Sequence, residues 1–274
     1  MRKCQSSGWT GFGISCSDIV NGFRILAREF VRLAAKDGRL TAVIFLPLLV
    51  WRRLRNIDSG PVARPDPSGA AFDQRYGVDT CGVVPMAHLA VVDTNWVHGF
   101  GYQPILPDEL DSLWLEFDID FRSAAFVDLG AGKGRALMLA SQHPFKRIIG
   151  VEIAEELVEI ARTNLQSFDK HEGRSSACEI ICADAASYRF PPEPLFLYLY
   201  NPFDAPIMRK VIANLVGSFI SRPRRIVVAY FRPELAEMWD LAPEFVLTRS
   251  SPRLRVYDNR TTLENSGPMA SEMI

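Results

Sequence analysis

The sequence has few of the residues from which metal sites and disulfide frameworks are built. Its 274 residues include five cysteines and four histidines, and no two cysteines form a Cys-x-x-Cys pair. An odd number of scattered cysteines argues against a secreted disulfide scaffold, and the closely spaced ligands of structural zinc sites are missing. We therefore expect a cytoplasmic protein of a reducing compartment, without a zinc site.

The sequence also lacks a long apolar run and a net charge of either sign. Its most lipid-like segment, Leu40 to Trp51, is twelve residues long and contains Pro47. A membrane-spanning helix needs about 20 apolar residues, so this segment is too short to cross a bilayer. The formal net charge is -1, so the composition gives no general electrostatic argument for binding nucleic acid or a membrane.

The N-terminal part is expected to be helical and basic. Apolar residues recur at three- and four-residue steps over residues 17–56, and arginines greatly outnumber acids there. Such a helix either presents a solvated face or contacts an anionic membrane surface or a partner protein. A cluster of Pro, Gly and Ser over residues 59–69 predicts a linker. We expect an extension over residues 1–70, one domain over residues 71–261 and a disordered tail over residues 262–274.

Short apolar segments alternate with helical segments from residue 124 onward. The predicted strands cover residues 124–129, 147–152, 179–184, 195–200 and 225–230. Helical segments between them predict a parallel sheet covered on both faces. Two late strands, 245–249 and 254–257, are close enough to form an antiparallel hairpin. The expected fold is α/β, a Rossmann-like doubly wound sheet that is mostly parallel and has an antiparallel C-terminal edge hairpin.

The most informative motif is the segment 126–135, an apolar strand that ends in an acid and continues into a glycine-rich loop. Its glycines stand at every second position: Gly130, Gly132 and Gly134. A loop without side chains lets a ligand approach the backbone. The dinucleotide fingerprint is excluded because it needs a glycine where Arg135 stands. The phosphate-binding P-loop is excluded because it needs a glycine at Val127 and a Ser or Thr at position 134.

Acidic residues follow three successive strands of the predicted sheet. Asp128 and Glu152 end the first two strands, and Asp184 ends the third. The carboxyl ends of parallel strands meet at the edge where α/β proteins bind ligands. Glu152 follows the first glycine by about 20 positions, the spacing of a carboxylate that accepts hydrogen bonds from ribose hydroxyls. A helix N-cap is the alternative for each acid alone, but the three together favour an adenosyl ligand.

With these motifs, the chain from about Tyr76 to Tyr257 resembles the class I S-adenosylmethionine-dependent methyltransferases. The resemblance implies that S-adenosyl-L-methionine is the cofactor and that the glycine loop contacts its methionine and ribose parts. It also implies that Asp128 faces the methionine amino group, Glu152 the ribose hydroxyls and Asp184 the adenine amine. The residues thus implied for the cofactor site are Asp128, Gly130, Ala131, Gly132, Gly134, Glu152, Asp184 and Tyr102.

Two further segments carry the resemblance. The Arg-Tyr-Gly-Val-Asp-Thr segment at residues 75–80 is similar to a segment of uncharacterised bacterial methyltransferases. Tyr102-Gln103-Pro104 is similar to the Tyr-x-Pro element with which several lysine-directed methyltransferases close over the cofactor, although Ile105 replaces their usual Ser or Thr. The alternative for Tyr102 is a buried aromatic residue whose hydroxyl is satisfied by the protein.

The predicted substrate side follows the fourth strand. Asn201-Pro202-Phe203 is similar to the Asn-Pro-Pro-aromatic motif of methyltransferases that act on amino nitrogen, with one proline fewer. This similarity implies that Asn201 is the candidate catalytic residue, which accepts the hydrogens of the target amine. The alternative is a simple Asn-Pro turn. Arg232, after the fifth strand, is expected to bind either an acidic substrate or a neighbouring carboxylate.

These observations predict an S-adenosylmethionine-dependent methyltransferase that acts on an unidentified acceptor, an amino nitrogen such as a protein lysine or a small molecule. One alternative is a non-catalytic methyltransferase-like module that binds a partner through residues 17–56. The other is an NAD(P)-dependent oxidoreductase, which shares the fold but conflicts with Arg135.

Overall fold

The computed structural model describes residues 66–84, 101–111, 114, 117, 119–173 and 178–265. The chain divides into two compact units, Met1–Asp58 and Ser59–Ile274, and all described residues belong to the second. The predicted basic extension over residues 17–56 therefore lies outside the described residues. The expected domain limits stay predictions, and two helices cross them, α3 (Pro67–Tyr76) and α9 (Arg260–Asn265).

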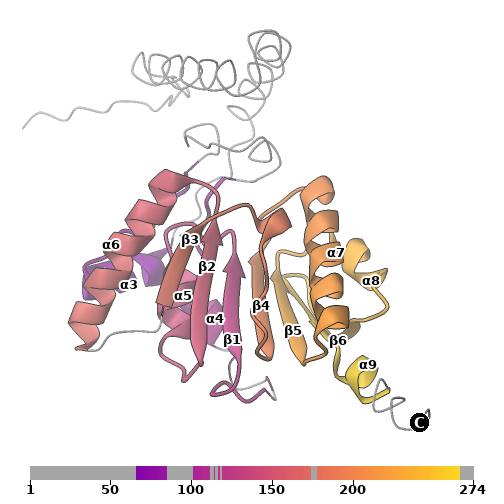
Figure 1. The fold of residues 1–274 in the computed structure, drawn as a ribbon. Helices are drawn as coiled ribbons and strands as arrows, with labels where there is room; N and C mark the ends of the chain where they lie inside the picture. The colour runs from indigo at the N-terminus through magenta and orange to yellow at the C-terminus, as the bar shows by residue number, and fades with distance from the viewer. Residues whose placement is uncertain are drawn as a thin grey trace, which may run out of the picture. The chain divides into compact units, whose positions relative to one another are not determined.

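The second unit is built on a seven-stranded sheet with the order β3-β2-β1-β4-β5-β7-β6 (Figure 1). Its strands are β1 (Ala125–Leu129), β2 (Arg147–Glu152), β3 (Cys178–Cys182), β4 (Leu195–Tyr200), β5 (Ile226–Phe231), β6 (Val246–Ser250) and β7 (Leu254–Asp258). Strands β1 to β5 pair in parallel, whereas β7 pairs antiparallel with both β5 and β6. The expected mostly parallel sheet with an antiparallel edge hairpin is confirmed.

Helices cover both faces of this sheet. Besides α3 and α9, the described helices are α4 (Pro107–Asp111), α5 (Arg135–Ala140), α6 (Glu155–Glu172), α7 (Ala205–Ser221), α8 (Ala236–Asp240) and the 3-10 turn η4 (Ala185–Ser187). Side chains of α3 to α6 pack on one face, and those of α7 and α8 pack on the other. Within the described ranges, none of the helices combines the length and apolar character that crossing a membrane requires.

The central strands have apolar side chains on both faces, because successive residues of a strand point to opposite sides. Phe126 and Phe196 belong to the core layer under α3 to α6, whereas Val127 and Leu197 belong to the layer under α7 and α8. All five residues of β1 are buried. Strands held from both sides give the loops at their carboxyl ends a rigid base.

The order of the strands reverses beside β1. The chain passes from β1 to β2 and β3 on one side of β1, and then returns to β4 and β5 on the other. At such a point the loops that leave neighbouring strands diverge and open a crevice at the carboxyl ends. The loops that begin at Gly130, Asn201 and Arg232 all leave this edge of the sheet.

Candidate functional site

The glycine loop after β1 is packed closely by two other segments. Gly130, Gly132 and Gly134 have φ values of +86°, +54° and +86°. A Cβ atom at Gly130 would lie 2.7 Å from Cβ of Pro202, and one at Gly132 would overlap the ring of Tyr102. The sequence predicts a loop open to a ligand. The structure adds that the same glycines let Tyr102 and Pro202 approach the loop.

Glu152 supports the glycine loop from the end of β2. Its Oε2 accepts a hydrogen bond from the Gly132 amide at 2.9 Å, and its Oε1 accepts from the amides of Ile153 and Ala154 at 2.8 and 2.9 Å. Burial raises the pKa of this carboxyl, while the three backbone hydrogen bonds act in the opposite direction. The carboxylate therefore holds the loop next to the end of β2.

Asp128 is a buried carboxyl at the end of β1. It is 3% exposed, and no described residue donates a hydrogen bond to its side chain. Burial, and then the charge of Glu152, hold its pKa well above the usual range. Its register partner on β4 is Tyr198, whose buried hydroxyl also has no hydrogen-bond partner among the described residues. The structure thus leaves the buried Tyr198 hydroxyl unsatisfied, which is costly in a protein interior, beside a carboxyl that has no hydrogen-bond donor among the described residues.

Asp184 lies two residues after β3 and caps a short turn. Its Oδ1 accepts a hydrogen bond from the Ala186 amide at 2.9 Å, at the N-terminus of η4. The N-cap that we considered as the alternative for each acid is therefore present at Asp184. Such a cap still leaves acceptor positions on a carboxylate, because each carboxylate has about four lone-pair sites.

Tyr102 is buried with its hydroxyl satisfied by the protein. The hydroxyl donates to the Thr80 carbonyl at 2.6 Å, and Tyr102 forms an isolated antiparallel bridge with Val84. Burial raises its pKa well above the usual range. Its ring meanwhile lies against Gly132, and Lys133 Nζ is 5.6 Å from the ring centroid. The geometry matches the buried-aromatic alternative and also places Tyr102 on the predicted cofactor loop.

Asn201 begins the loop after β4 in an unusual conformation. Among the described non-glycine residues only Asn201 and Arg232 have positive φ values, 41° and 46°. Asn201 Oδ1 accepts a hydrogen bond from the Tyr230 hydroxyl at 3.1 Å, and the Asn201 amide donates to the Phe231 carbonyl. Because Pro202 touches Gly130, the structure brings Asn201 beside the glycine loop.

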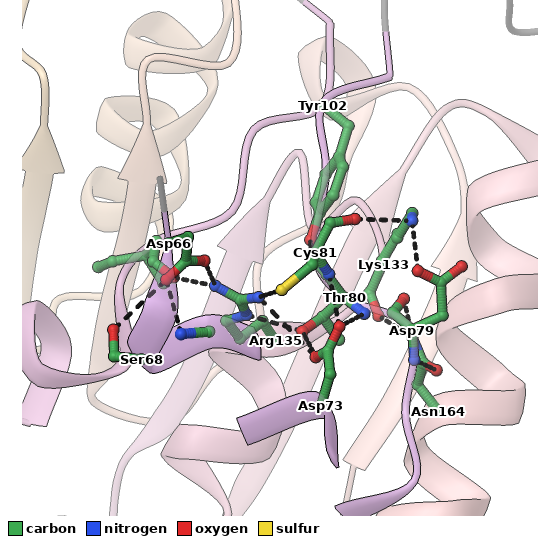
Figure 2. A network of polar contacts seen from close by, with 12 residues as sticks. Asp66, Ser68, Asp73, Asp79, Thr80, Cys81, Tyr102, Lys133, Arg135 and Asn164 are labelled. Atoms are coloured by element: carbon green, nitrogen blue, oxygen red, sulfur yellow. Dashed lines mark hydrogen bonds and ion pairs between the residues drawn. The ribbon is translucent and has the colours of Figure 1, made fainter. Parts of the chain in front are cut away.

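A polar network that the motifs did not reveal connects the glycine loop to the segment before it (Figure 2). Arg135 is at its centre, with a side chain 1% exposed. The guanidinium donates to Asp66 Oδ2 and Thr80 Oγ1, both at 2.7 Å, and to the Ile105 carbonyl at 2.8 Å. Asp73 lies 3.8 Å from the same group. Apolar residues follow Arg135 throughout α5, and this pattern is the feature of the sequence from which the burial of Arg135 could have been predicted.

Lys133 and Asn164 form the second half of this network. Lys133 Nζ lies 2.8 Å from Asp79 Oδ1 and 3.1 Å from the Cys81 carbonyl. The Asn164 amide donates to the carbonyls of Asp79 and Lys133, and its oxygen accepts from the Asp79 amide. The segment 75–80, noted only for its resemblance, is therefore held on the glycine loop by side chains from α5, α6 and the loop itself.

A cavity of about 160 Å³ lies at the carboxyl ends of β4 and β5. Tyr200 and Phe231 end these two strands and line the cavity, together with Gln103, Arg232 and Arg253. Arg232 Nη1 donates to Gln103 Oε1 at 2.8 Å, and its guanidinium is 5.5 Å from the centroid of the Tyr200 ring. Gln103 and Tyr200 are chain neighbours of Tyr102 and Asn201, so the cavity lies at the same edge of the sheet as both predicted sites, although neither Tyr102 nor Asn201 lines it.

Residues 126–216 match a family model that is described as a methyltransferase domain. The match begins in β1, includes the glycine loop and the ends of β2, β3 and β4, and finishes in α7. No curated protein matches the sequence.

Solved structures resemble the chain at a distance. An RNA methyltransferase from Salinibacter ruber in complex with S-adenosyl-L-homocysteine is 20% identical, with a TM-score of 0.35 over 57% of this chain and 92% of that chain. A SAM-dependent methyltransferase from Aquifex aeolicus is 13% identical, with a TM-score of 0.40 over 56% and 87%. A predicted N6-adenine-specific DNA methylase from Listeria monocytogenes is 15% identical, with a TM-score of 0.44 over 57% and 51%. At these low TM-scores, the similarities identify neither a ligand nor a substrate.

Proposed function

We propose that the protein transfers the methyl group of S-adenosylmethionine to an amino nitrogen held beside Asn201, since residues 126–216 match a family model described as a methyltransferase domain. The observation that carries this proposal is the buried carboxyl of Asp128, which has no hydrogen-bond donor among the residues that the structure describes and lies directly before a loop with three glycines of positive φ. The loop and the acid together suit a ligand that carries a positive charge on a compact body.

Asp128 fits the amino group of the methionine part. An ionised carboxylate that is buried without a partner is unstable, and an ammonium group supplies both the missing charge and the missing hydrogen-bond donors. We assign to Gly130, Ala131, Gly132 and Gly134 the role of letting the same ligand lie against the backbone, because larger residues would add atoms to an already crowded loop.

Glu152 and Asp184 fit the two ends of the adenosyl part. Oε1 of Glu152 accepts two backbone amides and Oε2 accepts one, so Oε2 retains a lone pair for a ribose hydroxyl. We assign to Asp184 the adenine amine, a role that its cap on η4 leaves room for. Tyr102 lies with its ring on Gly132 and restricts the access of solvent to that side of the loop.

When bound, S-adenosylmethionine supplies an electrophilic methyl group on a sulfonium. The carbon–sulfur bond breaks as the carbon–nitrogen bond forms, and the nitrogen must be neutral to provide its electron pair. Asn201 Oδ1 already accepts from Tyr230 and has a second lone pair, which we assign to a hydrogen of the acceptor amine. That bond would aim the nitrogen lone pair at the methyl group, and alignment of this kind is a large part of what a protein contributes to such a transfer.

Calorimetric titration with S-adenosylhomocysteine tests the cofactor assignment directly. We expect one site per chain and no competing binding of NADH. If the folded protein bound NADH and not S-adenosylhomocysteine, the proposal would be wrong and the NAD(P)-dependent oxidoreductase would be favoured instead.

Replacing Asp128 is expected to separate the binding of the methionine part from that of the adenosyl part. Asp128→Asn should weaken S-adenosylhomocysteine binding about 10- to 100-fold, because a charge-assisted hydrogen bond of about 1.5–3 kcal/mol is lost. The matched ligand is 5′-methylthioadenosine, which keeps the adenosyl part, including the adenine amine, but lacks the α-amino group of the methionine part, and its affinity should change little. An equal loss for both ligands would show that Asp128 acts only through the loop.

The affinity for S-adenosylhomocysteine should also depend on pH. The pKa of Asp128 is raised, so lowering the pH through that value protonates the carboxyl and removes its attraction for the ammonium group. The affinity of the wild-type protein for S-adenosylhomocysteine should therefore decrease as the pH is lowered, whereas the affinity of Asp128→Asn should lack this decrease.

The raised pKa of Asp128 has the opposite consequence for the stability of the unliganded protein, because there the charge is buried without an ammonium group beside it. The destabilisation from burying the charge is complete above the raised pKa, declines as the pH falls toward the ordinary pKa of an unfolded aspartate, and is absent below that value, so Asp128→Asn should be more stable than wild type at neutral pH.

A further inference from the structure

Arg232 lies at the wall of the cavity beside β4 and β5, and no described carboxylate forms an ion pair with it. We propose that this cavity binds the carboxylate of a small methyl acceptor, with Arg232 as the residue that recognises it. The inference rests on the proposed function and narrows its acceptor from any amine to a small molecule that carries both an amino nitrogen and a carboxylate.

Two carboxylates, Asp66 and Glu109, and two guanidiniums, Arg232 and Arg253, line the cavity, and both carboxylates form ion pairs with arginines other than Arg232. Asp66 pairs with Arg135 at 2.7 Å, and Glu109 pairs with Arg253. Within the part of the chain that the structure describes, no carboxylate forms an ion pair with Arg232, whose guanidinium is bonded to the neutral amide of Gln103. The sequence left two partners open for Arg232, an acidic substrate or a neighbouring carboxylate. The structure favours the substrate.

The backbone at Arg232 adopts the left-handed region, which a non-glycine residue seldom adopts. Arg232 has a φ of +46°, and its neighbour across the strand ends, Asn201, has a φ of +41°. Asn adopts this region more readily than most residues, whereas Arg has no such preference. Hydrogen bonds from the Arg232 amide to the Arg253 carbonyl and from Glu234 to the Arg232 carbonyl hold the conformation. Strain at two adjacent strand ends is typical of a functional site.

The remaining walls define the body of the acceptor. The rings of Tyr200 and Phe231 are 6.1 Å apart and nearly parallel, and both line the cavity. They suit a flat or apolar body, while the Arg232 guanidinium lies over the Tyr200 ring and faces the same space. Asn201 and Arg232 directly follow the paired strand ends Tyr200 and Phe231, so the cavity and the proposed site of transfer lie at the same edge of the sheet.

The same charge disfavours a protein lysine as acceptor. A lysine arrives as an ammonium ion and must lose a proton before it can accept a methyl group. An unpaired guanidinium in the cavity repels the ammonium ion and attracts a carboxylate. The small volume of the cavity is a second argument for a compact acceptor.

The probe pair 4-aminobenzoate and 4-aminobenzamide tests the inference, because the two differ in charge and little in shape. Each is titrated into the protein saturated with S-adenosylhomocysteine. We expect wild type to bind the benzoate at least tenfold more tightly than the benzamide, since only the carboxylate pairs with the guanidinium. Arg232→Asn, which keeps a residue suited to positive φ, should remove this preference and leave S-adenosylhomocysteine affinity unchanged. Arg232→Lys should restore part of it.

The matched control is Arg253→Gln, because Arg253 lines the same cavity but is already paired with Glu109. It should reduce the preference far less than Arg232→Asn does. Equal binding of the two probes by wild type, or tighter binding of N-acetyl-lysine amide than of 4-aminobenzoate, would overturn the inference even if every variant failed to fold. If S-adenosylhomocysteine itself does not bind, the proposed function fails instead, so the two failures are distinguishable.

Discussion

Gly132→Ala is expected to weaken S-adenosylhomocysteine binding by more than about 100-fold and to lower the free energy of unfolding by about 2–4 kcal/mol. Two effects add at this residue. The backbone has a φ of +54°, and the new methyl group would overlap the Tyr102 ring. Tyr102 is fixed by its hydrogen bond to Thr80, so relief must come from a shift of the glycine loop. Calorimetry and chemical denaturation measure the two losses.

Gly77→Ala is the matched control for Gly132→Ala. Gly77 has a φ of +64°, close to that of Gly132, but a Cβ atom there would meet nothing within 4 Å. It should cost about 1–2 kcal/mol from the backbone conformation alone and leave cofactor affinity unchanged. Combining Gly132→Ala with Tyr102→Leu should then give a coupling free energy of about 1 kcal/mol or more. Purely additive effects would show that the loop and Tyr102 are not in contact.

Arg135→Met is expected to lower the free energy of unfolding by about 3–5 kcal/mol, because it leaves buried negative charge without its partner. Asp66 and Asp73 both approach this guanidinium, and the side chains of these two aspartates are each 15% exposed. A chain of this size loses roughly 2–4 °C in Tm per kcal/mol, so the melting temperature should fall by about 6–20 °C. Thermal melting followed by circular dichroism measures the change.

Arg162→Met provides the comparison for Arg135→Met. Arg162 pairs with Glu159 on the same helix, α6, and the two side chains are 48% and 63% exposed. Such a surface pair contributes at most about 0.5 kcal/mol. Asp66→Asn should also recover part of the loss in Arg135→Met, because the charge left behind is then removed. If Arg135→Met were no more harmful than Arg162→Met, the network in Figure 2 would not stabilise the domain.

The prediction of the fold from the sequence succeeded where short-range patterns are strong. The continuous apolar segment 195–200 is β4 with the predicted limits, and the segment 147–152 is β2. A strand buried on both faces needs apolar residues at every position, and this requirement is visible without knowledge of its neighbours. Asp128, Glu152 and Asp184 were placed near strand ends for the same reason.

Partners of the polar side chains were not visible in the sequence. Arg135 was used only to exclude a dinucleotide site, because nothing in its local sequence indicates Asp66, which precedes it by 69 residues. Arg232 was left between a substrate and a carboxylate, and its actual neighbour, Gln103, is 129 residues away. Which side chains meet at these distances depends on the order of the strands, which apolar patterning does not specify.

The sequence by itself determined the class of the domain, because the spacing of three glycines and of the acids near strand ends is a local pattern that can be recognised without knowledge of the tertiary contacts. Only the tertiary structure decided what surrounds that loop. Among the described residues, it placed the Tyr102 ring on Gly132, gave Asp128 no hydrogen-bond donor and gave Arg232 no carboxylate partner beside the cavity. These features arise where segments that are distant in the sequence meet at the carboxyl edge of the sheet. Whether a charged side chain finds a partner there depends on which other side chains reach the same edge, and that is decided by the order of the strands.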